Sequence, residues 1–170
     1  DRLAQCEAVF AAEHLPMIVR ITPFTVPADL DERLADIGLQ RFDDTRVMVL
    51  QDLPAVDVPS LPAGISIQSI GLEAFAQRVG ALRGSPLSQR LAHGQRLVQL
   101  PVPFRAFELR LDNEVVACGQ SAQEADLVGL YDIFTAEAVR GRGFAKLLCT
   151  HLLGEAHRQA ALHELGGGHD

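Results

Sequence analysis

The residues best suited to chemistry are two arginines that alternate with two glycines at positions 140–143. They stand between an apolar segment and an amphipathic one, where we expect a strand to turn into a helix. The first amides of a helix lack partners inside it and lie at the positive end of its dipole. Gly141 and Gly143 would leave those amides open to an anion, and the arginines would add donors that suit phosphate oxygens. We therefore predict a ligand that carries phosphates; the alternative is a plain basic turn that begins a surface helix.

Two common nucleotide-binding motifs do not fit this loop. A Walker loop would need Gly-Lys-Ser or Gly-Lys-Thr at the end of its glycine-containing segment, and none follows here. Lys146 occupies the place of the third glycine in the dinucleotide pattern G-x-G-x-x-G. An oxidoreductase that uses a nicotinamide dinucleotide is therefore disfavoured.

The segments on either side of the loop have clear periodicity. Leu127 to Thr135 is apolar and rich in β-branched and aromatic residues, which predicts a largely buried strand. A helix is predicted from Phe144 to about residue 160, because residues recur there at helical spacing: Phe144, Leu147, Leu148, His151, Leu152 and Glu155.

Taken with these flanks, Arg140-x-x-Gly143-x-Ala145 resembles the acetyl-CoA signature of the GNAT acyltransferase superfamily. The resemblance implies an α/β (α+β) fold: a mixed, mostly antiparallel twisted sheet with helices on both faces. It also implies acetyl-CoA as co-substrate, with its pyrophosphate on the loop amides and its pantetheine arm along the preceding strand. The cofactor-binding residues implied in this way are Ile133, Phe134, Thr135, Arg140, Gly141, Arg142, Gly143, Phe144 and Ala145.

The activity that the resemblance implies is transfer of an acetyl group to a primary amine, which attacks the thioester directly. The amine must lose a proton and the leaving thiolate must gain one. The candidate bases near the strand are Asp132, Glu108 and Asp126, and Tyr131 is the candidate acid. For any single candidate, the favoured alternative is a sheet residue that only faces solvent. His93 could touch substrate, although an exposed or core histidine is the commoner case.

No motif identifies the acyl acceptor, which we expect to be a small-molecule or peptide amine. The alternative function is a non-catalytic module that binds or senses acyl-CoA. Leu162 stands where the family often has a tyrosine acid, and this favours the alternative.

Upstream of the loop, the order of expected elements matches that of a GNAT domain. An alternating strand at 65–70 precedes helices at 71–83 and 86–100, which in the family lie beside the acceptor channel. Strands at 104–111 and 114–122 follow, joined at Asp112-Asn113, a pair that suits a tight hairpin.

Residues 1–60 are predicted to form a small αβ unit, a degenerate GNAT-like extension that ends in a proline-rich linker. Residues 61–170 would then be the GNAT domain. The elements expected in the extension are a helix at 1–15, a strand at 16–21, a helix at 27–38 and a strand at 46–50.

After the helix that follows the loop, the match to the family stops. Residues 161–170 faintly resemble the end of a short helix of the family, and its closing strands are missing or truncated. An edge of the sheet would then lack a partner strand, which proteins rarely tolerate. A partner chain could cover that edge, so a homodimer is one expectation.

The net charge and the distribution of histidines, cysteines and apolar residues limit the partners and cofactors to be expected. A formal charge of −7 argues against a nucleic-acid partner. Four histidines recur every six residues from His151 to His169, a spacing that does not align metal ligands on a helix, so no metal is expected. The three cysteines, Cys6, Cys118 and Cys149, are scattered and most simply core residues, which suits a reducing cytoplasm. No apolar run approaches the roughly 20 residues that a membrane-spanning helix needs, so no membrane partner is expected.

Overall fold

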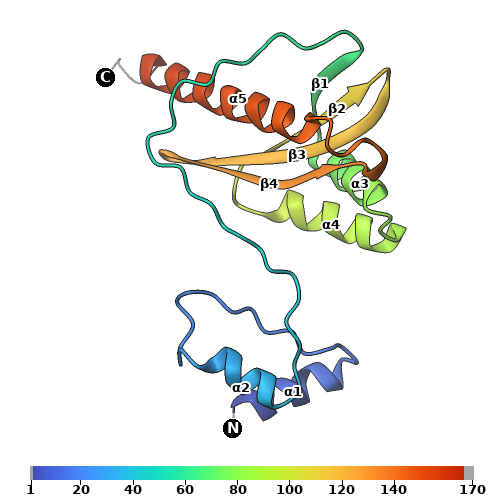
Figure 1. The fold of residues 1–170 in the computed structure, drawn as a ribbon, viewed down its shortest axis with the longest axis vertical. Coiled ribbons are helices and arrows are strands. Elements are labelled where there is room, and N and C mark those ends of the chain that lie inside the picture. Colours follow the sequence, from blue (N-terminus) through green and yellow to red (C-terminus); the bar gives the residue numbers. More distant parts are fainter. Residues whose placement is uncertain (1, 167–170) are drawn as a thin grey trace. The chain divides into compact units, whose positions relative to one another are not determined.

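The protein is described by a computed structural model in which residues 2–166 are placed (Figure 1). Its chain forms two compact units, residues 1–49 and residues 50–170. Each unit has its own local structure, and the regular sheet lies in the second.

The N-terminal unit contains two short helices, α1 (Arg2–Ala12) and α2 (Leu30–Asp36). Leu34 of α2 is the one buried residue of this unit among those described. Two residues after the end of the helix, Gly38 has a φ of +93°, which suits a glycine, and its N–H donates to the Ala35 carbonyl at 2.9 Å.

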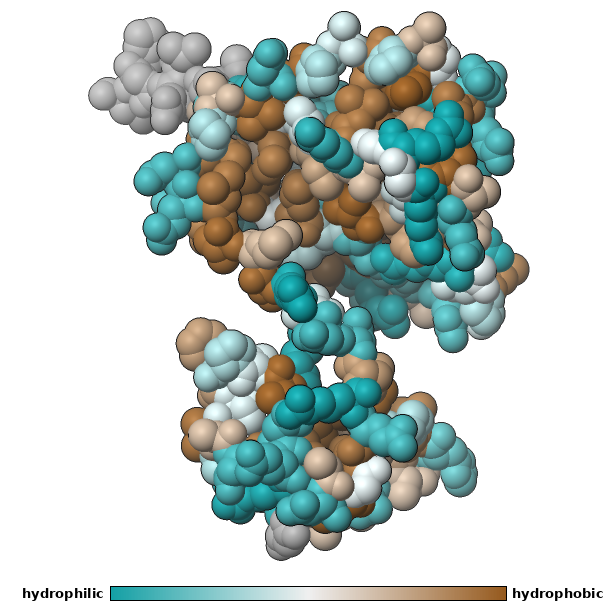
Figure 2. All heavy atoms as spheres, in the orientation of Figure 1, coloured by the Kyte–Doolittle hydropathy of each residue, from teal (hydrophilic) through white to brown (hydrophobic). Residues whose placement is uncertain are grey.

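The two strands predicted at residues 16–21 and 46–50 are wrong, because both segments lack regular hydrogen bonding. A lone pair of strands is marginal in water unless a hydrophobic face is covered. Here the apolar side chains at 47–49 are more than four-fifths exposed, and nothing in the described unit covers them. Hydrophobic residues accordingly reach the surface of this unit (Figure 2). Cys6 is also exposed, contrary to the core position expected for it.

The second unit is built on a four-stranded antiparallel sheet in the order β1-β2-β3-β4. Its elements are β1 (Ile65–Ile70), α3 (Leu72–Leu82), α4 (Leu87–Gln99), β2 (Phe104–Leu111), β3 (Glu114–Glu124), β4 (Leu127–Thr135) and α5 (Phe144–Gly166). The predicted strands and helices of this unit are confirmed, with ends that differ by one or two residues except at the C-terminus. Asp112 and Asn113 form the predicted hairpin turn, with φ of 48° and 72°.

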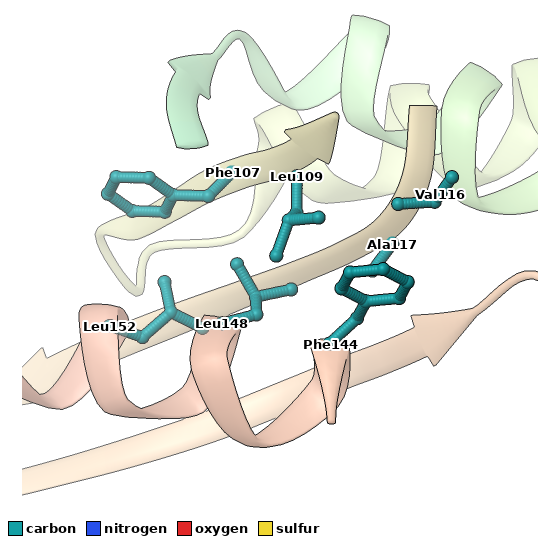
Figure 3. Close-up of a cluster of buried hydrophobic side chains, with 7 residues drawn as sticks. All are labelled: Phe107, Leu109, Val116, Ala117, Phe144, Leu148 and Leu152. Carbon is teal, nitrogen blue, oxygen red and sulfur yellow. The ribbon is translucent and has the colours of Figure 1, made fainter. Parts of the chain in front are cut away.

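Helices cover both faces of this sheet, as the GNAT resemblance implies. Figure 1 shows α5 along one face and α3 with α4 on the other. On the α5 face, Phe144, Leu148 and Leu152 lie four residues apart and meet Phe107 and Leu109 of β2 (Figure 3). On the opposite face, Phe75, Ala76 and Val79 of α3 pack with Leu97 of α4, Ala106 of β2 and Cys118 of β3.

Two expectations for the C-terminal half need correction. Strand β4 is only half-buried, because it is the edge strand, and among residues 2–166 no strand follows it. Helix α5 continues to Gly166, so residues 161–166 extend the central helix and do not form the end of a separate short helix. Residues 167–170 lie outside the described residues. No helix in the described part of the chain has the length and apolarity to cross a membrane.

Candidate functional site

The connection from β4 to α5 is a 3-10 turn (Glu137–Val139) followed by two glycines in left-handed conformations. Gly141 has a φ of 79° and Gly143 a φ of 86°, values that other residues adopt only with strain. No heavy atom lies within 4 Å of where a Cβ would stand on either glycine. The requirement for glycine is therefore conformational, and the space beside the loop is open.

Helix α5 begins directly after this loop. The N–H of Leu147 donates to the Gly143 carbonyl at 3.0 Å, so the amides of Phe144, Ala145 and Lys146 precede the ladder of helical hydrogen bonds. These amides lie at the positive end of the dipole of a long helix. The start of α5 is thus suited to an anion.

A hollow of about 510 Å³ opens where the end of β4 meets the start of α5. Its lining residues are Ile133, Phe134, Thr135, Val139, Arg140, Gly141, Gly143, Phe144 and Ala145. Every residue that the sequence assigned to cofactor binding lines this hollow except Arg142, and Val139 is the one lining residue not assigned. The structure brings these residues together, and their contact with a cofactor stays a prediction.

Arg140 ties the strand to the loop. Its Nε donates to the carbonyl oxygen of Thr135 at 3.2 Å, and its guanidinium carbon lies 5.3 Å from the ring centroid of Phe134. The hydroxyl oxygen of Thr135 is buried without a hydrogen-bond partner among the described residues. The guanidinium carbon of Arg142 lies 5.1 Å from the ring centroid of Phe144.

A β-bulge interrupts β4 just before these residues. Cys118 pairs with Phe134 and Gln120 with Tyr131, so Gly119 of β3 alone faces both Asp132 and Ile133. Asp132 takes a φ of 50°, which is uncommon for a residue with a side chain. The bulge places the Asp132 carboxylate beside Arg83, which directly follows α3, and beside His93 of α4.

Both oxygens of the Asp132 carboxylate have partners. Nη2 of Arg83 donates to Oδ1 at 2.9 Å, and Nε2 of Gln120 donates to Oδ2 at 3.1 Å. Nε2 of His93 lies 3.6 Å from the same Oδ2. The sequence named Asp132 and His93 as separate candidates, and the fold brings them side by side.

This pair lies in a second hollow of about 240 Å³. Its lining residues come from α3, α4, the turn between them and β4: Ala76, Val79, Gly80, Arg83, Ser85, Gln89, Arg90, His93, Arg96 and Asp132. The arginines of this hollow were not recognised from the sequence. The available signal was the spacing of Arg90, His93 and Arg96, one helical turn apart on α4.

Glu108, a candidate base, is buried beside polar groups of β1, β2 and α3, and its Oε2 has no hydrogen-bond partner among the described residues. Gln68 and Arg110 donate to its Oε1, Arg110 at 2.7 Å, and Nε of Arg78 lies 3.3 Å from its Oε2. The residue is 1% exposed and lines neither hollow. Burial, together with the charge of Glu108, raises the pKa of Cys118 to about 12. Glu108 is thus placed as a buried polar anchor beneath α3.

The remaining candidates also lie outside the two hollows. Tyr131 is 48% exposed, and its ring packs edge-on against Phe104 at 5.4 Å. Asp126 is exposed in the turn before β4, at the other end of the strand from the loop. Among the described residues, no three His, Cys, Asp or Glu side chains gather as they would around a metal ion.

Comparison with solved structures finds acetyltransferases. A GCN5-related N-acetyltransferase from Kribbella flavida is 20% identical with a TM-score of 0.46, over 61% of this chain and 39% of that one. The present chain thus spans well under half the length of that protein. The aminoglycoside acetyltransferase AAC(6')-Iy, bound to a bisubstrate analogue, is 20% identical with a TM-score of 0.41, over 59% of this chain and 74% of that one. An aminoglycoside acetyltransferase from an uncultured soil metagenomic sample is 17% identical with a TM-score of 0.39, over 58% and 73% of the two chains.

A search of curated proteins finds no match. The sequence profile of the Acetyltransferase (GNAT) family, in contrast, matches residues 81–166, half of the chain. The matched part runs from the end of α3 through α4, three strands and the loop to the last residue of α5. The chain belongs to the GNAT acetyltransferase family.

Proposed function

We propose that this protein is an acetyl-CoA-dependent N-acetyltransferase that acts on a primary amine. The observation that carries the proposal is the 510 Å³ hollow where β4 ends and α5 begins. It combines two open glycines, Arg140 and the free start of a long helix, in a member of an acetyltransferase family.

The residues of the hollow divide naturally between two parts of CoA. The amides that begin α5 and the donors of Arg140 suit the negatively charged pyrophosphate. Ile133 to Thr135 lie on the edge strand, whose outward N–H and C=O groups have no neighbouring strand among residues 2–166. These groups suit the amide groups of the pantetheine arm, which would pair with β4 as a further strand does.

The acetyl thioester supplies the electrophilic carbonyl carbon, and the protein must supply a proton acceptor for the amine. We assign this role to His93, because imidazole exchanges protons near neutral pH and this ring faces the second hollow. Asp132 lies 3.6 Å from Nε2 of His93 and would stabilise the imidazolium that forms. The ion pair from Arg83 and the hydrogen bond from Gln120 hold the Asp132 carboxylate in place.

The test is a thermal-shift titration with acetyl-CoA, followed by an assay of thiol release over a panel of amines. A ligand that binds only the native state stabilises it by about 2.7 kcal/mol at 100 times its Kd. The double variant Arg140→Ala with Gly143→Asp removes a donor and adds a carboxylate in the hollow, so it should abolish the shift. An unchanged shift in a folded double variant would refute the assignment of the loop.

The variant His93→Gln tests the proton acceptor separately. It should keep the acetyl-CoA shift and lower thiol release by about 100-fold, the low end of general-base effects. Normal turnover in His93→Gln would exclude this histidine as the base.

A non-catalytic acyl-CoA-binding module is the second candidate function. It is favoured by the surroundings of the two carboxylates that the sequence offered as bases, Asp132 and Glu108. Asp132 has partners on both oxygens, and Glu108 is buried beneath α3. Asp132 is thus already engaged, and Glu108 is out of reach of an amine in either hollow. An acetyl-CoA shift without thiol release from any amine of the panel would support this candidate.

A further inference from the structure

We infer that the acyl acceptor carries an anionic group, a carboxylate or a phosphate, and that Arg90 and Arg96 of α4 bind it. The inference rests on the proposed function, because it takes the second hollow as the acceptor site. It narrows the acceptor from any primary amine to an amine that also bears a negative charge.

The charge of the hollow supports this assignment. Three arginines and one aspartate line it, which leaves two positive charges in excess when His93 is neutral. The whole chain, by contrast, has a formal charge of −7. Positive charge is thus concentrated at this hollow in an otherwise acidic protein, and like charges gathered in one place are stabilised when an anion lies among them.

The pairing of the charges shows which arginines are available. Arg83 forms an ion pair with Asp132 and lies over the ring of Phe134 at 5.3 Å, so its guanidinium is already engaged. Arg90 and Arg96 form no ion pair within the described part of the chain. Glu73 of α3 packs against Gly94 of α4, but it does not line the hollow.

Arg90 is also held in position by packing. Its aliphatic stem crosses Gly80 of α3 so closely that a Cβ on Gly80 would stand 2.7 Å from its Cδ. Its Nε is buried, and no acceptor among the described residues bonds to it. A buried donor without a partner costs free energy, and an anionic oxygen would satisfy it.

The placement of His93 gives the acceptor an orientation. Arg90 and Arg96 stand one helical turn before and after His93 on α4. An amine beside His93 and Asp132 would therefore have its anionic group within the reach of an arginine on the same helix. The acceptor that fits is a short molecule with an amine at one end and a carboxylate or phosphate at the other.

The experiment compares matched amines that differ in their anionic group. Binding of 4-aminobutyrate against butylamine, and of O-phosphoethanolamine against ethanolamine, is measured by calorimetry with and without saturating CoA. CoA occupies the proposed loop site, so anions bound there do not contribute. We expect at least one anionic member to bind roughly tenfold tighter than its neutral partner, the effect of one charge-assisted hydrogen bond. The pair that discriminates more strongly distinguishes carboxylate from phosphate.

The double variant Arg90→Gln with Arg96→Gln should remove this preference. Glutamine keeps the first carbons of the stem over Gly80, and Arg90→Lys with Arg96→Lys, which keeps the charge, should retain part of the preference. The matched control is Arg20→Gln with Arg46→Gln, which makes the same charge change at exposed positions of the N-terminal unit.

Equal binding within both pairs, or a preference that survives in the Gln double variant, would overturn the inference. The acetyl-CoA thermal shift is read independently in all variants. If the wild-type protein binds acetyl-CoA but binds the anionic and neutral amines equally, only the inference is refuted. If acetyl-CoA causes no thermal shift in the wild-type protein, the proposed function is refuted.

Discussion

Gly119 of β3 sits opposite the bulge in β4, and replacing it with alanine tests that geometry directly. A Cβ at this position would stand 2.5 Å from Cδ1 of Ile133, 3.2 Å from Cδ2 of Leu148 and 3.4 Å from Cδ1 of Leu152. The first distance is far below van der Waals contact, so Ile133 must change its rotamer or β4 must shift. Overpacking of a core costs about 1–3 kcal/mol, and we expect Gly119→Ala to lower the free energy of unfolding by that amount.

The closest contact of the added Cβ is with one methyl group, Cδ1 of Ile133. A double-mutant cycle can therefore test how much of the loss in unfolding free energy comes from this contact. Ile133→Val removes the Cδ1 atom and should itself cost about 0.5–1.5 kcal/mol. In that background the main clash is gone, so Gly119→Ala should cost about 1 kcal/mol less than in the wild type. Urea unfolding followed by circular dichroism measures the four free energies.

Gly94 of α4 provides the matched control. A Cβ there would meet its nearest neighbour, Cβ of Ala76, at an ordinary 3.5 Å, so Gly94→Ala should be neutral or stabilise the helix by up to about 1 kcal/mol. If the effects of Gly119→Ala and Ile133→Val add to within about 0.5 kcal/mol, the described contact between β3 and the bulge is wrong.

Three further predictions concern the thiols, the pH dependence and the loop. Cys6 is exposed and should react with a thiol reagent in the native protein, whereas Cys118, with its pKa raised to about 12 by burial, should react only on unfolding; equal native rates would contradict this. Burial lowers the pKa of His151 below 6.5, and a hydrogen bond from Arg158 lowers that of Glu155 below 4.5, so the unfolded state binds more protons. The unfolding free energy should therefore fall as pH drops through 6.5 and again below 4.5, and His151→Gln should remove the first of these losses in urea unfolding at several pH values. Gly141→Ala should lower stability by about 1–2 kcal/mol because of its left-handed φ, and a thermal melt that does not move would show that the turn can adopt another conformation.

Local sequence patterns correctly predicted most of the second unit. The alternation in Ile65–Ile70, the turn at Asp112-Asn113 and the four-residue spacing of Phe144, Leu148 and Leu152 act between residues close in the chain. Such signals survive in a single sequence because each depends on backbone conformation or on one face of one element. The same signals failed at residues 16–21 and 46–50, because a strand needs a partner and a covered face, which lie elsewhere in the chain.

The sequence by itself determined the family and the phosphate-suited loop, because Arg140, Gly143 and Ala145 lie within one turn between a strand and a helix. Only the tertiary structure decided which candidate residues share a site. It buried Glu108 beneath α3, and it used a one-residue bulge to bring Asp132 beside His93. It also gathered Arg83, which directly follows α3, and Arg90 and Arg96 of α4 into one hollow. These placements depend on strand register and on which helix faces meet, and both are set by the packing of segments that are distant in the chain.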